Sequence, residues 1–350
     1  MANVVVTGGS GFLGSRLSRE LLAGRGPGPL EVAGAGARPL TGLTLVDRAP
    51  PPADVAADSR VSVIAGDLAD LLDPASGSNS RSGTDPRSAR GALASADVIF
   101  HLAAAVSAEC EADFDLGMRT NLAVTESLLA TCRALGTNPV VVFASSVAVF
   151  GATAGHPLPA VVDDHTLPSP QSSYGTQKLV AEYLLADYTR KGFLRGRTVR
   201  LMTVVVRPGR PNAAASGFLS AIIREPLAGQ RATCPVDPGT EVAIASPARA
   251  IEGLLRAATS PESAWGGPAA VNLPSLTITV ADMVAALERA AGPPAGALID
   301  WVPDPAVARI VTGWPARFRT DRAAGLGLAP DPDFDSIIAM HRAETATRKA

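Results

Sequence analysis

The sequence has few cysteines, no excess of basic residues and no long apolar run, features that mark disulfide-bonded or metal-binding, nucleic-acid-binding and membrane proteins respectively. Its three cysteines, Cys110, Cys132 and Cys234, show neither metal-ligand spacing nor an even disulfide set, which fits a reducing cytosol. The net charge is −2 and the pI is about 6.1, so no basic surface for nucleic acid is expected. No run approaches the roughly 18 uninterrupted apolar residues that span a bilayer, and the first residues do not resemble a signal peptide. We expect a cytoplasmic protein with a small-molecule partner and no metal, nucleic-acid or membrane partner.

Apolar residues are plentiful, at 47%, enough for a sizeable core in one large or two modest domains. Strand-like runs alternate with helical ones, which predicts an α/β fold with a Rossmann-type doubly wound parallel sheet that binds ligands at the carboxyl ends of its strands. The expected strands are residues 4–6, 43–47, 61–65, 97–104 and 140–146. The expected helices are residues 114–135, 174–191, 214–227 and 282–291. The stretches 24–42 and 73–91 are expected to be loops, and the polar tail 344–350 is expected to fray.

A glycine turn follows the first strand directly. Glycines recur every third residue and precede leucines at helical spacing, so strand, turn and helix come in the order that a pyrophosphate site requires. The alternative is a tight strand-to-helix turn without a ligand. The expected contacts with a dinucleotide are Gly8, Gly11, Phe12, Leu13 and Gly14.

Asp47 ends the second strand. A carboxylate there accepts hydrogen bonds from an adenosine ribose and repels a 2′-phosphate, which favours NAD over NADP, although Arg48 beside it offsets part of the repulsion. Asp67 and Leu68 follow the third strand, where a turn would contact the adenine.

Small or hydroxylated residues end the next two strands. Leu102, Ala103 and Ala104 allow close approach by a ligand. His101 is expected to be a packed strand residue, and Ser107 to contact cofactor or substrate. Ser145 and Ser146 end the 140–146 strand. Their hydroxyls could hydrogen-bond a reacting oxygen; the alternative is that they are only polar residues at a strand end.

Tyr174 and Lys178 lie four residues apart at the start of a helical stretch. They would therefore project from one helix face, and a neighbouring cation lowers the pKa of a phenol. Such a pair suits a tyrosine that exchanges a proton with an alcohol or a carbonyl. Taken alone, the spacing is more typical of an ordinary pair on a helix surface.

In this order, and with Asn121 and residues 207–209 added, the motifs resemble those of extended short-chain dehydrogenases/reductases, the NAD-dependent epimerase/dehydratase group. The resemblance covers roughly residues 3–230. It implies bound NAD, with Asn121 in the cofactor site. It also implies that Tyr174 exchanges the proton, that Lys178 lowers its pKa and holds the nicotinamide ribose, and that Ser146 positions the substrate. Phe150 replaces the tyrosine common in sugar-nucleotide epimerases.

Residues 204–227 resemble the corresponding stretch of D-erythronate dehydrogenases. That resemblance implies oxidation of the C2 hydroxyl of a small sugar acid, D-erythronate to 2-dehydro-D-erythronate. An acid needs a cationic anchor, for which Arg224 is the candidate unless it pairs with Glu225 or faces solvent. Arg207 is expected to be structural, and Asn212 and Ser216 to bind sugar hydroxyls.

The expected domains are residues 1–195 for NAD and a smaller substrate-binding region, 196–350, interleaved with the last strands of the sheet. A homodimer is compatible with the sequence. Two other functions stay open: a sugar-nucleotide epimerase or dehydratase, and a dinucleotide-binding redox sensor without catalysis.

Overall fold

A seven-stranded parallel sheet forms the centre of the computed structural model, which describes residues 2–24, 30–32, 36–73, 85, 87–209 and 214–349. The strand order is β12-β8-β7-β6-β1-β4-β5, with every neighbouring pair parallel. The order reverses beside β1, so the carboxyl ends of β1 and β6 flank the crevice where such sheets bind ligands. The strands are β1 Ala2–Thr7, β4 Leu40–Asp47, β5 Val61–Ala65, β6 Val98–His101, β7 Val140–Ser146, β8 Arg195–Leu201 and β12 Val271–Asn272.

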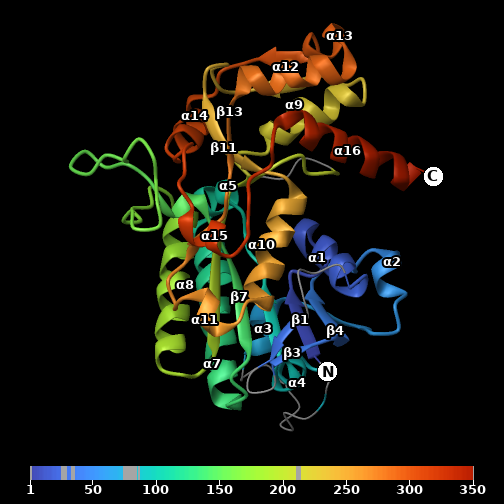
Figure 1. Ribbon diagram of the computed structural model, residues 1–350, viewed down its shortest axis with the longest axis vertical. Helices are drawn as coiled ribbons and strands as arrows, with labels where there is room; N and C mark the ends of the chain where they lie inside the picture. Colours follow the sequence, from blue (N-terminus) through green and yellow to red (C-terminus); the bar gives the residue numbers. More distant parts are fainter. Residues whose placement is uncertain are drawn as a thin grey trace.

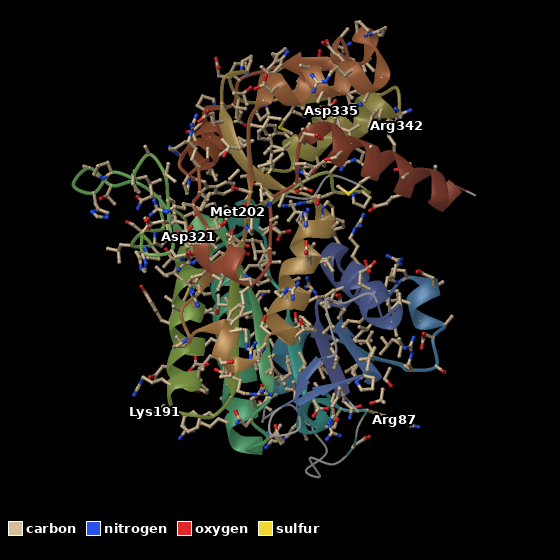
Figure 2. The ribbon with its side chains drawn as sticks, in the orientation of Figure 1. Arg87, Lys191, Met202, Asp321, Asp335 and Arg342 are labelled. Atoms are coloured by element: carbon tan, nitrogen blue, oxygen red, sulfur yellow. The ribbon has the colours of Figure 1, made fainter. Side chains whose placement is uncertain are left out.

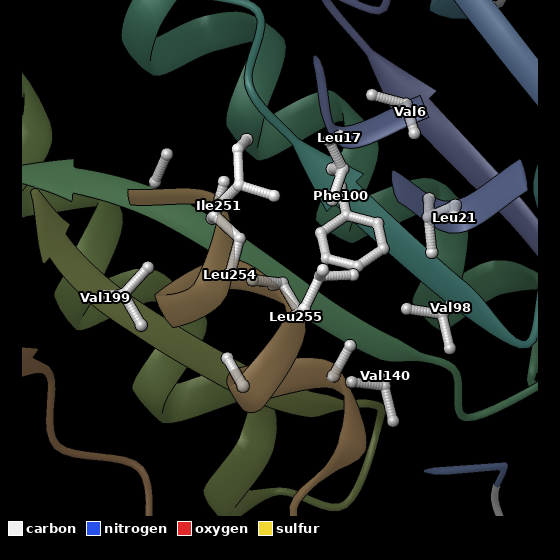
Figure 3. Close-up of a cluster of buried hydrophobic side chains, with 14 of the residues drawn as sticks. Val6, Leu17, Leu21, Val98, Phe100, Val140, Val199, Ile251, Leu254 and Leu255 are labelled. Atoms are coloured by element: carbon white, nitrogen blue, oxygen red, sulfur yellow. The ribbon is translucent and has the colours of Figure 1, made fainter. Parts of the chain in front are cut away.

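The strands are apolar on both sides because helices cover both faces of the sheet. Alternate residues of one strand enter different cores: Val4 and Val6 lie in one, and Val5 lies in the other. Figure 3 shows the first core, where Phe100 of the sheet packs among residues of helices α1 and α10. This two-sided burial positions the strand ends rigidly.

Helices on the face of Figure 3 are α1 Phe12–Leu22, α2 Ala53–Ala56, α10 Pro247–Thr259, α11 Glu262–Trp265 and α15 Asp321–Gly325. The opposite face carries α3 Leu68–Leu72, α4 Ala89–Ser95, α7 Val124–Leu135 and α8 Ser173–Arg190. Shorter elements follow β6 and β7: α5 Ser107–Ala112, α6 Phe114–Gly117, the π-helix η1 Met118–Ala123 and the 3₁₀ turn η2 Val147–Val149. No helix within the described ranges has the length and apolar character to cross a bilayer.

A second region lies above the carboxyl ends of the strands in Figure 1. It has its own apolar core, built from residues after 204. Its strands are β9 Thr203–Val204, β10 Ala232–Cys234, β11 Glu241–Ala245, β13 Leu276–Thr279 and β14 Ile299–Trp301, and its helices are α9 Phe218–Leu227, α12 Val280–Ala291, α13 Pro293–Gly296, α14 Pro305–Thr312 and α16 Phe334–Lys349.

The two regions join through a small apolar cluster that contains Val147, Met202 and Ala245. Met202 is labelled near the middle of the molecule in Figure 2. β8, α10 and β12 complete the sheet and its core although they come late in the chain, so the second half of the chain is interleaved with the sheet. The boundary at residue 195 itself stays a prediction.

Several predicted bounds change. The expected loop 24–42 contains the hairpin β2 Leu30–Val32 and β3 Gly36–Arg38 and the start of β4, while 25–29 and 33–35 lie outside the described residues. The expected loop 73–91 ends in α4, with 74–84 and 86 outside the described residues. The sixth strand of the chain, β6, is shorter than predicted, and α9 begins at Phe218 rather than at residue 214. The tail is helical to Lys349, where fraying was expected, and Glu344 pairs with Arg16.

Candidate functional site

The glycine turn connects β1 to α1 at the crevice. Gly8 has a φ of +71°, which side chains rarely adopt, and a Cβ on Gly14 would lie 2.1 Å from the Gly8 carbonyl oxygen. The turn therefore needs both glycines in order to close. Helix α1 begins after Gly11 with Phe12 and Leu13; no side chain caps it and its first turn holds no acid, so its N–H groups suit an anion.

Asp47 lies beside this turn because β4 pairs with β1. Its carboxylate accepts hydrogen bonds from the backbone N–H groups of Ser10 and Ala49, both at 3.0 Å. Each carboxylate oxygen keeps a further lone pair, so Asp47 can still accept from a ribose hydroxyl. The uncapped helix and this carboxylate together form a donor and acceptor set that fits a dinucleotide.

The turn after β5 is further out. Asp67 caps α3 by accepting from Ala69 N at 3.0 Å, and Arg48 lies 3.8 Å from its other oxygen. Leu68 is buried against the second core. A contact of Asp67 or Leu68 with adenine stays a prediction.

The end of β6 is braced by Asn121. Its carboxamide accepts from Ala105 N at 2.8 Å and donates to Ala105 O, Cys110 Sγ and Gln177 Oε1. Asn121 lies in the π-helix η1, a distortion frequent at functional sites. Asn121 therefore holds the turn beside Leu102, Ala103 and Ala104 through its own hydrogen bonds, so its route to a cofactor would be indirect.

Tyr174, Lys178 and Ser146 come together at the carboxyl end of β7. The Ser146 hydroxyl hydrogen-bonds the phenol of Tyr174. The ammonium of Lys178 donates to Ala144 O at 3.0 Å, and its nitrogen lies 5.7 Å from the centre of the Tyr174 ring. Gly175 permits this approach, because a Cβ there would lie 2.0 Å from the Ala148 carbonyl oxygen.

The pKa shifts at this site differ from those expected. Burial raises the pKa of Tyr174 to about 12, while Ser146 and the guanidinium of Arg207 act to lower it. Burial lowers the pKa of Lys178 to about 8. The expected net lowering of the Tyr174 pKa is therefore not seen, since desolvation outweighs charge, and Arg207 is the cation that acts on the phenol. The role of Lys178 in lowering this pKa stays a prediction.

His101 is a packed strand residue, as predicted. Its ring nitrogens lie 2.7 Å from Thr7 Oγ1 and 2.9 Å from Thr125 Oγ1, and its ring stacks on Phe143. Burial, with help from Lys178, lowers its pKa to about 3. His101 is thus a neutral part of the core beneath the site.

Two predicted substrate contacts are corrected. Ser145 is 2% exposed and donates its hydroxyl to Glu182, because its side chain faces α8 rather than the crevice. Arg224 pairs with Glu225 and donates to Arg207 O at 2.7 Å, so its guanidinium is already occupied.

Two further predicted contacts, Ser107 and Ser216, lie near one another. Ser107 Oγ accepts from Ala215 N at 3.2 Å, which joins the turn after β6 to the segment that carries Ser216. Both serines are buried. Asn212 lies outside the described residues.

Arg207 was expected to be structural, and one of its guanidinium nitrogens does hold the backbone. Its Nε donates to Val204 O at 3.0 Å, and within the described part of the chain its two Nη groups donate to no residue. Burial lowers its pKa, and the charge of Arg207 acts on Tyr174. A half-buried guanidinium with spare donors beside the phenol suits an anionic group. The signal in the sequence was its place in the motif at residues 207–209, which alone does not show which arginine is paired.

Within the described ranges, no three His, Cys, Asp or Glu side chains are grouped so as to hold a metal ion.

Comparison with known proteins agrees with this geometry. The chain is 44% identical to the D-erythronate dehydrogenase of Cupriavidus necator over 348 residues, covering 99% of this chain and 100% of that protein. It is 36% identical to the D-erythronate dehydrogenase of Haemophilus influenzae over 335 residues, 96% of this chain and 97% of that one. A crystal structure described as a nucleoside-diphosphate-sugar epimerase from Agrobacterium tumefaciens superposes with a TM-score of 0.83 at 38% identity, over 97% of this chain and 93% of that one. The model of the NAD dependent epimerase/dehydratase family matches residues 4–243, and the chain belongs to that family.

Proposed function

We propose that the protein is an NAD-dependent dehydrogenase that oxidises the C2 hydroxyl of a small sugar acid, D-erythronate first, to the 2-keto acid. The observation that carries the proposal is that a proton-exchanging phenol, Tyr174, has the Ser146 hydroxyl and the Arg207 guanidinium beside it. A hydroxyl partner and a cation are what a hydroxy acid needs. The names of the two relatives support the same activity.

Bound NAD would supply the hydride acceptor, held by the glycine turn and by Asp47. The substrate hydroxyl lies between Ser146 and Tyr174, and the phenolate of Tyr174 takes the hydroxyl proton as the C2 hydrogen leaves as hydride. Because the phenol of the free chain has a pKa of about 12, it must first lose its proton, and oxidation gains from rising pH. Lys178, with a pKa of about 8, carries a charge at neutral pH that stabilises the phenolate.

The substrate carboxylate is assigned to Arg207 in place of Arg224. Arg224 would act through Arg207, because it donates a hydrogen bond to the Arg207 carbonyl and its own charge is paired with Glu225. Ser107 and Ser216 flank the same region and suit the remaining hydroxyls.

The test is a substrate screen that follows NADH absorbance at 340 nm, with four- to six-carbon aldonates and uronates beside UDP-sugars. Stoichiometric NADH from D-erythronate is expected. Conversion of a UDP-sugar without net NADH would instead favour an epimerase, the activity for which the Agrobacterium protein is named. NAD binding with no turnover of any acid or sugar nucleotide would favour the redox sensor.

We also propose a cytoplasmic homodimer. Its contact would use exposed apolar side chains of α6 and α8, which pack together: Phe114 and Tyr183 are each 59% exposed, and Val180 is 38% exposed. Light scattering on the wild type and on Tyr183→Glu tests this, since a wild-type monomer would exclude it. The three cysteines are free and buried, which suits a reducing compartment.

A further inference from the structure

Helix α8 contacts the end of β7 through one residue on each of three successive turns. Tyr174, Lys178 and Glu182 are spaced four apart and so lie on one helix face. They contact, respectively, the hydroxyl of Ser146, the carbonyl of Ala144 and the hydroxyl of Ser145. The proposed function uses the first two contacts and leaves the third unexplained.

Glu182 is a buried carboxylate, 5% exposed, with a fixed set of partners. Arg200 of β8 donates to it from Nε at 2.9 Å and from Nη2 at 2.6 Å. Arg200 is 7% exposed and lies over the Phe150 ring, 4.9 Å from its centre. A buried ion pair is weak evidence for stability, since well-packed apolar residues often do as well. The pair therefore invites a role in positioning.

We propose that Glu182 is a positioning residue of the catalytic site: held by Arg200, it fixes Ser145, and with it the end of β7 that presents Ser146, and it places a negative charge one helical turn from Lys178. This inference rests on the proposed function for its kinetic readout only. Arg200 orients the Glu182 carboxylate, and the carboxylate binds the hydroxyl of Ser145. The position of Ser145 in turn sets the distance between its neighbour Ser146 and the phenol of Tyr174.

The charge on Glu182 opposes the effect of burial on Lys178. Desolvation lowers the Lys178 pKa, whereas Glu182 on the same helix and Cys110 on α5 raise it. The other groups that face the ammonium are Tyr174 of α8 and His101 of β6, and His101 stays neutral because its own pKa is about 3. Loss of the Glu182 charge should therefore lower the Lys178 pKa further below about 8.

Two variants separate the two parts of the proposal. Ser145→Ala removes the hydrogen bond between Ser145 and Glu182 and leaves the Glu182–Arg200 pair intact. Glu182→Gln keeps an oxygen for Ser145 but removes the charge. The control is Glu262→Gln, which removes the charge of an exposed carboxylate that pairs with Arg197, another buried arginine of β8.

The readouts are kcat and KM for the acid, the affinity for NAD, the pH profile of kcat, and NMR titration of protein labelled with ¹³C at lysine Cε. The titration resolves few signals, because the lysines of the chain are Lys178, Lys191 and Lys349. Ser145→Ala should lower kcat about tenfold, with KM and NAD affinity within twofold. Glu182→Gln should move the Lys178 titration and the alkaline limb of kcat to lower pH, whereas Glu262→Gln should move neither.

A folded Ser145→Ala enzyme with wild-type kcat, or one that loses only melting temperature, would overturn the strand-holding role. An unmoved Lys178 titration in folded Glu182→Gln would overturn the electrostatic role. If Glu182→Gln does not fold because Arg200 is left unpaired, Ser145→Ala still decides the strand-holding role. If the wild type oxidises no acid, the proposed function fails, while the lysine titration still tests the role of Glu182.

Discussion

Replacing Gly175 by alanine should move Tyr174 away from Ser146, the two residues proposed to hold the substrate hydroxyl, while the protein stays folded. The alanine Cβ would lie 2.0 Å from the carbonyl oxygen of Ala148, in the turn directly after Ser146. Carbon and oxygen need at least about 3 Å, so the start of α8 must retreat from this turn by about 1 Å. Tyr174 is the adjacent residue and moves with it.

The size of the effect follows from that displacement. A misplacement of about 1 Å costs about 100-fold in rate, equal to about 2.7 kcal/mol of transition-state stabilisation. The strain on folding should cost about 1–3 kcal/mol, as for other overpacked sites. The glycine turn lies on a different element, so the affinity for NAD should change little.

The assay is NADH production at 340 nm, with NAD affinity from fluorescence quenching and stability from thermal unfolding. Gly325→Ala is the control, because nothing lies within 4 Å of a Cβ at that glycine and its φ is not positive. A folded Gly175→Ala protein with kcat within threefold of wild type would refute the claim that this close approach sets the catalytic geometry.

Three further predictions concern single side chains. Tyr174→Phe should lower kcat at least about 100-fold with NAD affinity intact, and undiminished turnover would remove the phenol from the mechanism. Arg207→Gln should lower kcat/KM for sugar acids about 30-fold or more, mostly through KM, and Arg224→Gln should do less; the reverse order would restore Arg224 as the anchor. His101→Gln tests pH dependence: with a pKa of about 3 folded and 6.5 unfolded, His101 contributes stability above pH 6.5 that is lost as the pH falls, about 3 kcal/mol by pH 4.5. The stability gap between wild type and variant, measured by urea unfolding, should therefore narrow between pH 7 and pH 4.5, and a constant gap would contradict a buried neutral imidazole.

Local rules were enough to predict much of the site from the sequence. The glycine turn, Asp47 and the end of β7 were predicted from the order of strand, turn and helix, because parallel strands bring their carboxyl ends to one edge. The spacing of Tyr174 and Lys178 predicted a shared helix face, which the structure confirms. Each of these inferences needs only neighbours along the chain or the general topology of the fold.

What the sequence could not predict depends on partners far apart in the chain. Ser145 and Ser146 are adjacent and chemically identical, but only the fold shows that one faces Glu182 on α8. Arg207 and Arg224 likewise differ through their contacts. Arg224 pairs with Glu225, whereas the charge of Arg207 acts on the phenol of Tyr174. A residue type and a spacing show what a side chain can do, while its occupied hydrogen bonds show what it is free to do.

Electrostatics at Tyr174 shows the same dependence on burial. An ammonium four residues away on a helix lowers the pKa of an exposed phenol, but here the site is buried, and desolvation acts on both groups in opposite directions. The phenol keeps its proton more tightly and the lysine less tightly, so the two pKa values approach each other from 10.0 and 10.5 and then cross, to about 12 and about 8. A proton therefore resides on Tyr174. Arg207 and the carboxylate of Glu182 behind Lys178 limit these shifts, the first by attracting the phenolate and the second by keeping the ammonium charged.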